Sequence, residues 1–135
     1  QSFRIAGRKP DAIKCQREMR ALITEENATM QDTAATRHNN RGVMLEKAGD
    51  LNRAVVNYRA AVTLNPSQTT FRRNLALALC RQGHWGQGVA ELRKVLQDSP
   101  ADTEATKALY IALDHLKGNS SSAVSSAHTT KPGPP

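Results

Sequence analysis

The residues that could catalyse a reaction or hold a metal ion are few in this sequence and widely scattered. Its four histidines show none of the spacings at which side chains share a metal ion: His38, His84, His115 and His128. The glycine-rich segment Gly83–Gly88 reads GHWGQG, but a phosphate-binding loop must follow a strand, and no strand pattern precedes this one. We therefore expect no enzymatic activity, no metal and no cofactor.

The two cysteines, Cys15 and Cys80, are too few to build a metal framework. One interpretation makes them free thiols that pack as small apolar residues. The other makes them a disulfide, which would require neighbouring helices and an oxidising compartment. The sequence leaves this pairing open, and it also leaves open whether the triplet beginning at Asn27 carries a glycan.

The elements that must position these residues come from a 34-residue unit that occurs twice, over 35–68 and 69–102. The two copies share residues at seven aligned pairs: Thr36/Thr70, Asn40/Asn74, Leu45/Leu79, Gly49/Gly83, Val55/Val89, Arg59/Arg93 and Pro66/Pro100. A fixed period of about 20–50 residues is typical of repeat proteins. We therefore expect an array of similar units rather than one irregular globular domain.

Each unit carries two helical patterns. In the first unit, apolar residues recur at three- and four-residue steps after Gly49: Leu51, Ala54, Val55, Tyr58, Ala61 and Val62. Gly49 and Gly83 provide the backbone freedom for a tight turn between helices. Pro66 and Pro100 end the second helices. The pattern predicts helix–turn–helix, twice.

These residues resemble the tetratricopeptide repeat. That family keeps small residues at positions 8, 20 and 27, a bulky one at 24 and proline at 32. This chain has, in the two units, Gly42 and Ala76, Ala54 and Gly88, Ala61 and Val95, Tyr58 and Leu92, and Pro66 and Pro100. It departs from the family at His38 and Arg72, where tryptophan is common, and at Arg41, where leucine is preferred. The resemblance implies an all-α helix–turn–helix solenoid.

The resemblance also implies a concave face, lined by the first helix of each unit, that binds peptides. Its residues would be Asn39, Asn40, Val43, Lys47, Arg73, Asn74, Leu77, Arg81, Lys107 and Ile111. Val43, Leu77 and Ile111 would form an apolar floor. Arg73, Arg81 and Lys107 would form a basic wall for carboxylates, and Asn40 and Asn74 would bond a peptide backbone.

Four further segments flank or follow the two units. Residues 1–10 are expected to be an extended arm that anchors through Phe3 and Ile5, and residues 11–34 a leading helix and linker that cap the first repeat. Residues 103–118 restart the repeat with one lone helix that ends at Gly118, where Tyr110 would cover the surface of the absent second helix. Residues 119–135 read as a disordered Ser/Thr/Pro-rich tail.

The net charge and the first residue of the chain bear on the choice of partner and on location. The net charge of +7 is spread along the chain and aromatics are only 4%, so nucleic-acid binding is not favoured over a protein partner. No stretch reaches the roughly 18 apolar residues of a membrane span. An initial Gln is consistent with cleavage of an export signal, which slightly favours an exported protein over a cytoplasmic one. Two functions remain: a non-catalytic protein-binding module or scaffold, or a structural subunit that self-assembles into a filament or larger complex through its open solenoid end and its terminal arms. A homo-oligomer is compatible with the second.

Overall fold

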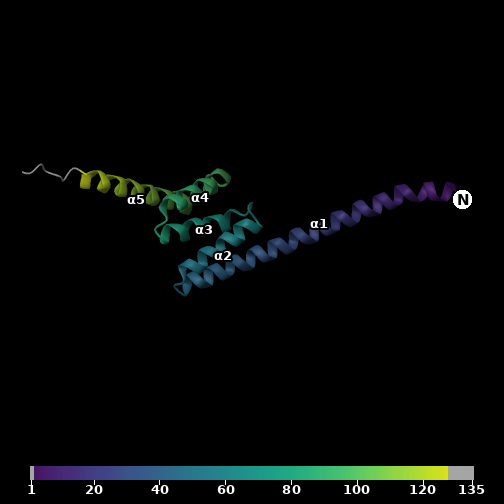
Figure 1. The fold of residues 1–135 in the computed structure, drawn as a ribbon, viewed down its shortest axis with the longest axis horizontal. Helices are drawn as coiled ribbons and strands as arrows, with labels where there is room; N and C mark the ends of the chain where they lie inside the picture. The colour runs from purple at the N-terminus through teal and green to yellow at the C-terminus, as the bar shows by residue number, and fades with distance from the viewer. Residues whose placement is uncertain (1, 128–135) are drawn as a thin grey trace, which may run out of the picture.

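Five consecutive helices make up the described chain: α1 (Ser2–Lys47), α2 (Leu51–Leu64), α3 (Thr69–Arg81), α4 (Trp85–Asp98) and α5 (Thr103–Ala127). A computed structural model describes the backbone of residues 2–127 and the side chains of residues 11–119. Each helix packs on the next, and α5 also contacts α3 (Figure 1). Residues 2–127 contain no strand. The predicted all-α helical solenoid is therefore confirmed, with α1–α2 and α3–α4 as its two full repeats.

The turns within the two repeats depend on glycine. Gly49 and Gly83 both have φ of +85°, a region that other residues rarely adopt. In the first turn, Asp50 then begins α2, because its side chain accepts a hydrogen bond from the backbone N–H of Arg53 at 3.1 Å. The two turns share one backbone geometry, which gives both helix pairs the same form.

Small residues let the helices of a pair approach closely. A Cβ atom on Gly42 of α1 would lie 2.6 Å from the ring of Tyr58 on α2, and Tyr58 is only 1% exposed. In the second pair, a Cβ atom on Gly88 would overlap the sulfur of Cys80. The core continues along the array through clusters whose largest fully buried members are Tyr58, Leu75, Leu79, Leu92 and Val95.

The departures at position 4 of the repeat have a common structural reason. His38 Nδ1 lies 3.2 Å from Asn57 Oδ1, and Arg72 pairs with Glu91 at 2.9 Å. Within each repeat, the contact joins position 4, on the first helix, to position 23, on the second helix. A polar pair between the helices thus stands where many repeats of this kind place tryptophan.

Both ends of the chain differ from the sequence-based expectation. Residues 2–10 are helical rather than extended, and α1 runs from there through Pro10 into the first repeat without a break. The side chains of Phe3 and Ile5 lie outside those that the structure describes. Once a helix exists, each added residue gains a backbone hydrogen bond, so a short Phe-Arg-Ile alternation is weak evidence for a strand.

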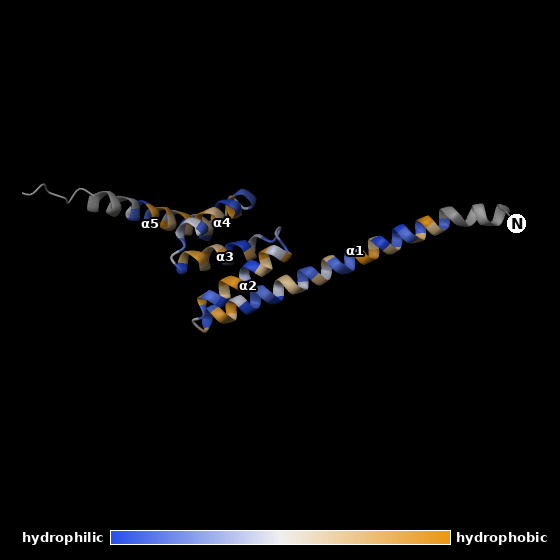
Figure 2. Cartoon of the chain, in the orientation of Figure 1, coloured by the Kyte–Doolittle hydropathy of each residue, from blue (hydrophilic) through white to orange (hydrophobic). Residues whose placement is uncertain are grey.

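The expected cap over the first repeat is also wrong. Every side chain from residue 11 to 33 is exposed, and this half of α1 projects away from the repeats (Figures 1 and 2). At the other end, α5 continues past Gly118 to Ala127 instead of stopping, so a disordered tail from 119 is wrong for residues 119–127. Residues 128–135, including the Pro132–Pro135 stretch, lie outside the described chain. Tyr110 is 68% exposed and does not cover the array's end.

Candidate partner-binding site

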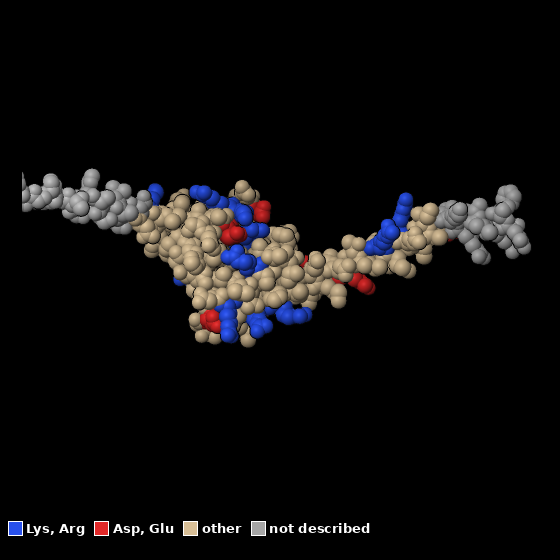
Figure 3. All heavy atoms as spheres, viewed as in Figure 1, with Lys and Arg blue, Asp and Glu red and all other residues tan. Residues whose placement is uncertain are grey.

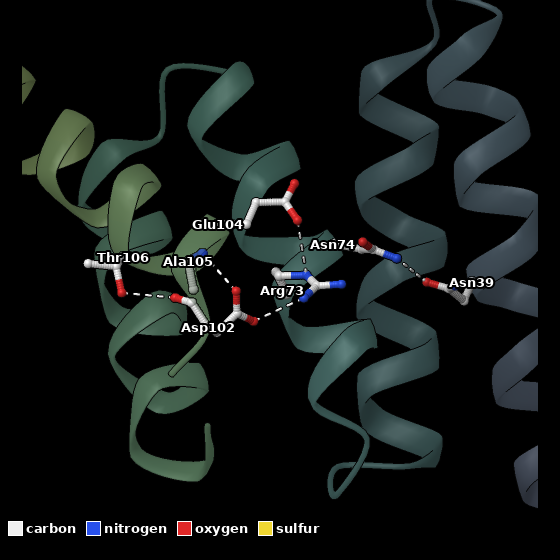
Figure 4. A network of polar contacts seen from close by, with 7 residues as sticks. All are labelled: Asn39, Arg73, Asn74, Asp102, Glu104, Ala105 and Thr106. Atoms are coloured by element: carbon white, nitrogen blue, oxygen red, sulfur yellow. Dashed lines mark hydrogen bonds and ion pairs between the residues drawn. The ribbon is translucent and has the colours of Figure 1, made fainter. Parts of the chain in front are cut away.

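The first helices of the repeats are joined across their shared face by polar contacts. Asn74 on α3 donates a hydrogen bond from Nδ2 to Oδ1 of Asn39 on α1, at 2.8 Å. Arg81 at the end of α3 forms an ion pair with Glu46 of α1. Figure 4 shows the Asn39–Asn74 contact beside the contacts that join α3 to α5. The polar contacts between α1 and α3 therefore involve side chains predicted to bind a partner.

Asp102 organises the contacts between α3 and α5. One carboxylate oxygen, Oδ1, accepts the backbone N–H of Ala105 at 3.0 Å, and the other, Oδ2, accepts from Arg73 Nη1 at 3.0 Å (Figure 4). The backbone carbonyl of Asp102 accepts from the hydroxyl of Thr106. The Ala105 hydrogen bond, assisted by the Arg73 guanidinium, holds the pKa of Asp102 below its ordinary value against the opposing effect of burial. Asp102 is thus both the N-cap of α5 and the partner of Arg73.

These pairings change the expected basic wall. Arg73 is occupied by Asp102, and its Nε lies 3.6 Å from Glu104 Oε2. The Arg81 guanidinium is occupied by Glu46, whose other oxygen accepts a hydrogen bond from the Tyr58 hydroxyl at 2.8 Å. Two of the three predicted cations, Arg73 and Arg81, are therefore paired with carboxylates of the same chain. Figure 3 shows basic and acidic groups next to one another over the repeats.

The apolar part of the predicted face has a definite shape. A hollow of about 200 Å³ is lined by Leu77, Cys80, Arg81, Trp85, Ala108 and Ile111. Clefts for drug-sized ligands enclose about 300–1,000 Å³, so this hollow suits one or two side chains of a protein. The Cys80 thiol is 8% exposed, and its burial raises its pKa. Cys80 and Cys15 are both free, which settles the open question of a disulfide between them.

Trp85 is the residue at this hollow that the sequence-based site lacked. It begins α4, and its ring stacks on that of His115 from α5, with centroids 4.0 Å apart and planes 5° from parallel. Its position in the repeat marked it only as a turn residue. As the single tryptophan in the sequence, next to a repeat turn, it was the available signal.

The other predicted residues are distributed unevenly around this hollow. Ile111 is 55% exposed at its edge, and Lys107, one helical turn earlier on α5, is exposed with no ion pair among the described residues. Asn40 and Lys47 are exposed on α1, and the partly buried Val43 packs against the core cluster that contains Tyr58. The structure thus brings Leu77, Arg81 and Ile111 together. The predicted residues on α1, which include Asn40, Val43 and Lys47, do not line this hollow.

Comparisons with known proteins bear on the fold. No protein-family model and no curated protein sequence matches this chain. Among solved structures, the tetratricopeptide-repeat domain of Arabidopsis OM64 matches with a TM-score of 0.62 and 22% identity, over 64% of this chain and 71% of that one. The TPR2AB domain of yeast Sti1, solved as a complex with pHSP90, matches with a TM-score of 0.62 and 18% identity, over 81% of this chain and 43% of that one.

The likeness to these two structures shows a tetratricopeptide-type fold. The chain spans less than half the length of the Sti1 chain. Among the described residues, no cluster of three or more histidine, cysteine or carboxylate side chains is arranged to hold a metal ion. None of the described helices combines the length and apolar character needed to cross a bilayer.

Proposed function

We propose that this chain is a non-catalytic protein-interaction module that binds a segment of a partner protein at the hollow between α3 and α5. The observation that carries the proposal is the half-exposed Ile111, which sits at the edge of an apolar hollow with room for a side chain. A large aliphatic side chain exposed on a helix gains free energy when a partner covers it. The structurally similar Sti1 domain was solved with a protein partner, pHSP90, which supports a binding role for this architecture.

The charges around the hollow favour a particular kind of partner segment. Lys107 is the unpaired cation next to Ile111, whereas Arg81 is already neutralised by Glu46. An apolar side chain in the hollow, followed or preceded by an acidic residue near Lys107, would satisfy both features. Exposed Asn40 lies on a different part of the face and would contact only a longer segment.

The test uses a phage-displayed library of random peptides selected on the immobilised chain. We expect the enriched peptides to share a large apolar residue beside an acidic one. Ile111→Glu should weaken binding of a selected peptide by at least about tenfold, because a buried anchor contact is commonly worth more than about 1.4 kcal/mol. Lys107→Glu should weaken it through charge repulsion.

The matched control is Arg93→Glu, which makes the same change of charge as Lys107→Glu but on the exposed surface of α4, outside the residues that line the hollow. It should leave peptide binding unchanged. Ile111 and Lys107 are exposed, so both variants should keep the wild-type melting temperature. Failure to enrich any peptide, or binding that survives Ile111→Glu, would contradict the proposal.

A further inference from the structure

The outer half of α1, residues 11–33, is a helix that buries no side chain on the rest of the described chain; at its inner end Asp32 accepts a hydrogen bond from Asn65. All of its side chains are exposed. Its three threonines, Thr24, Thr29 and Thr33, donate hydroxyl hydrogen bonds to carbonyls one turn earlier, a pattern that slightly weakens a helix. Most helical stability in proteins comes from packing an apolar face, and residues 11–33 bury no side chain on the rest of the described chain. A surface packed against its apolar residues would therefore stabilise this segment.

An apolar stripe runs along the same segment. Met19, Leu22, Ile23 and Met30 are 60%, 61%, 51% and 70% exposed. Their spacing of three, four and seven residues places them on one side of the helix, together with Ala12 and Cys15. Figure 2 shows apolar positions recurring along this part of α1.

The stripe points away from the repeats. The buried residues by which α1 packs on the rest of the chain are Ala35, Asn39 and Gly42. At about 100° of rotation per residue, these lie on the opposite side of the helix from Met19 and Leu22. A second helix can therefore lie along the stripe without meeting α2 or α3.

We propose that two copies of this chain pair through these stripes, with the two α1 helices antiparallel. The charges on the segment support both the occupant and its direction. Basic residues gather in the first half, at Lys14, Arg17 and Arg20, alongside two acids, whereas the second half has three acids and no base: Glu25, Glu26 and Asp32. Figure 3 shows the described basic groups toward the outer end of α1 and acidic groups nearer the repeats.

Antiparallel pairing places each basic half against an acidic half, while parallel pairing would oppose like halves and set Glu26 against Glu26 within the stripe. The pairing is two-fold symmetric and closed, with its axis near Leu22 and Ile23. Its extent is limited toward the repeats, where the same side of α1 carries the exposed cations Arg37 and Arg41. A stripe from residue 12 to residue 33 is centred on Leu22 and Ile23 and is about 33 Å long.

Light scattering on the full chain over a range of concentrations tests the association. We expect a dimer whose helical content, measured by circular dichroism, rises as it forms. Leu22→Glu should raise the dissociation constant by at least about 100-fold, because it sets two carboxylates at the axis. Thr24→Glu, with the same added charge on the opposite side of the helix, should leave the dimer intact. A chain that stays monomeric, or a dimer that survives Leu22→Glu, would overturn the proposal.

Disulfide formation tests the direction. In the antiparallel arrangement the two Cys15 residues lie about 22 Å apart along the axis, far beyond the roughly 4.4–6.8 Å between the Cα atoms of a disulfide. The wild-type chain should therefore form no covalent dimer on mild oxidation. In a Cys15→Ser background, Leu22→Cys should form one readily and Thr24→Cys should not. Oxidation that links two wild-type chains through Cys15 would show parallel helices and refute the antiparallel pairing.

Discussion

At Gly88 the second helix of the second repeat comes so close to α3 that a Cβ atom would overlap the sulfur of Cys80. Replacement by alanine must push the helices apart or displace the thiol. We predict that Gly88→Ala lowers the free energy of unfolding by about 1–3 kcal/mol, as overpacked cores do. Addition of Cys80→Ala should recover part of that loss, since it removes the overlapping atom. Urea denaturation monitored by circular dichroism measures both.

Gly86 is the matched control for this prediction. It lies in the same helix, and nothing is within 4 Å of the Cβ it would gain. Gly86→Ala should therefore stabilise the chain by up to about 1 kcal/mol, because alanine is a better helix former than glycine. If Gly88→Ala were no more destabilising than Gly86→Ala, close packing would not explain the glycine at position 20 of this repeat.

Asp102 gives the chain a pH-dependent contribution to stability. Its pKa in the folded chain lies below the ordinary value of 3.8, chiefly because its carboxylate accepts the Ala105 N–H. As pH falls past about 4, the unfolded chain takes up this proton before the folded chain does, so the contribution is complete above that pH and is lost below it. Asp102→Asn keeps a capping side chain but loses the charge pair with Arg73.

We predict that Asp102→Asn costs about 1.5 kcal/mol of stability near pH 6, typical of a hydrogen bond to a charged group. The difference in melting temperature between wild type and variant should stay constant from pH 7 to 5 and shrink below pH 4. Thermal melts across this range measure it, and the other carboxylates, common to both chains, cancel. A gap that is the same at pH 3 and pH 6 would mean that the Asp102 charge contributes nothing.

At the scale of the elements, the repeat period predicted the helix pairs correctly. Each pair has the same glycine turn and small residues at positions 8 and 20, so the sequence repeats where the structure does. The polar contacts between first helices follow the same logic: Asn39–Asn74 and Glu46–Arg81 both join residues 35 apart, one period plus one. The same offset predicts that Arg81 pairs with Glu46. The prediction of a basic wall is wrong for Arg81, because it takes the residues of α3 without those of α1 beside them.

The ends of the outer helices could not be predicted in this way. The alternation at Phe3 and Ile5 predicts an extended arm, the apolar face from Ala12 to Ile23 predicts a cap over the first repeat, and the composition from residue 119 predicts a disordered tail. The structure continues α1 and α5 through these segments instead. A helix can be extended by backbone hydrogen bonds alone. Such an extension requires no apolar side chains that pack within the chain, so no sequence pattern marks where it ends. The exposed stripe on α1 was visible in the sequence, but its partner was not.

At the scale of the whole molecule, the chain divides into a packed array and a projecting helix. Residues 35–113 form three core clusters, and the outer half of α1 contributes to none of them. The proposed peptide site lies between α3 and α5, and the proposed dimer contact lies on the far side of α1. The two proposals therefore fail independently: Ile111→Glu should leave the dimer intact, and Leu22→Glu should leave peptide binding intact.

This division predicts very different effects of shortening the chain at its two ends. Removal of residues 1–30 keeps Asp32, whose carboxylate accepts a hydrogen bond from Asn65 at 2.8 Å, and removes only exposed side chains among those described. The melting temperature, measured at a concentration where the full chain is monomeric, should change by less than about 3 °C. Removal of residues 103–135 uncovers Val89, Leu92 and Val95 of α4 and takes away the buried Ala105 and Ala112.

That second truncation should lower the melting temperature by more than about 10 °C, or abolish the cooperative transition. For a domain of this size, a loss of 1 kcal/mol in the free energy of unfolding lowers the melting temperature by about 4–8 °C. Loss of the whole contact between α4 and α5 should cost several kcal/mol. Differential scanning calorimetry of the two shortened chains beside the full one provides the comparison. If loss of residues 1–30 melted the repeats, the projecting half of α1 would belong to the folded array even in the monomer. Its apolar stripe would then have a partner within the chain, and pairing with a second copy would no longer be needed to explain it.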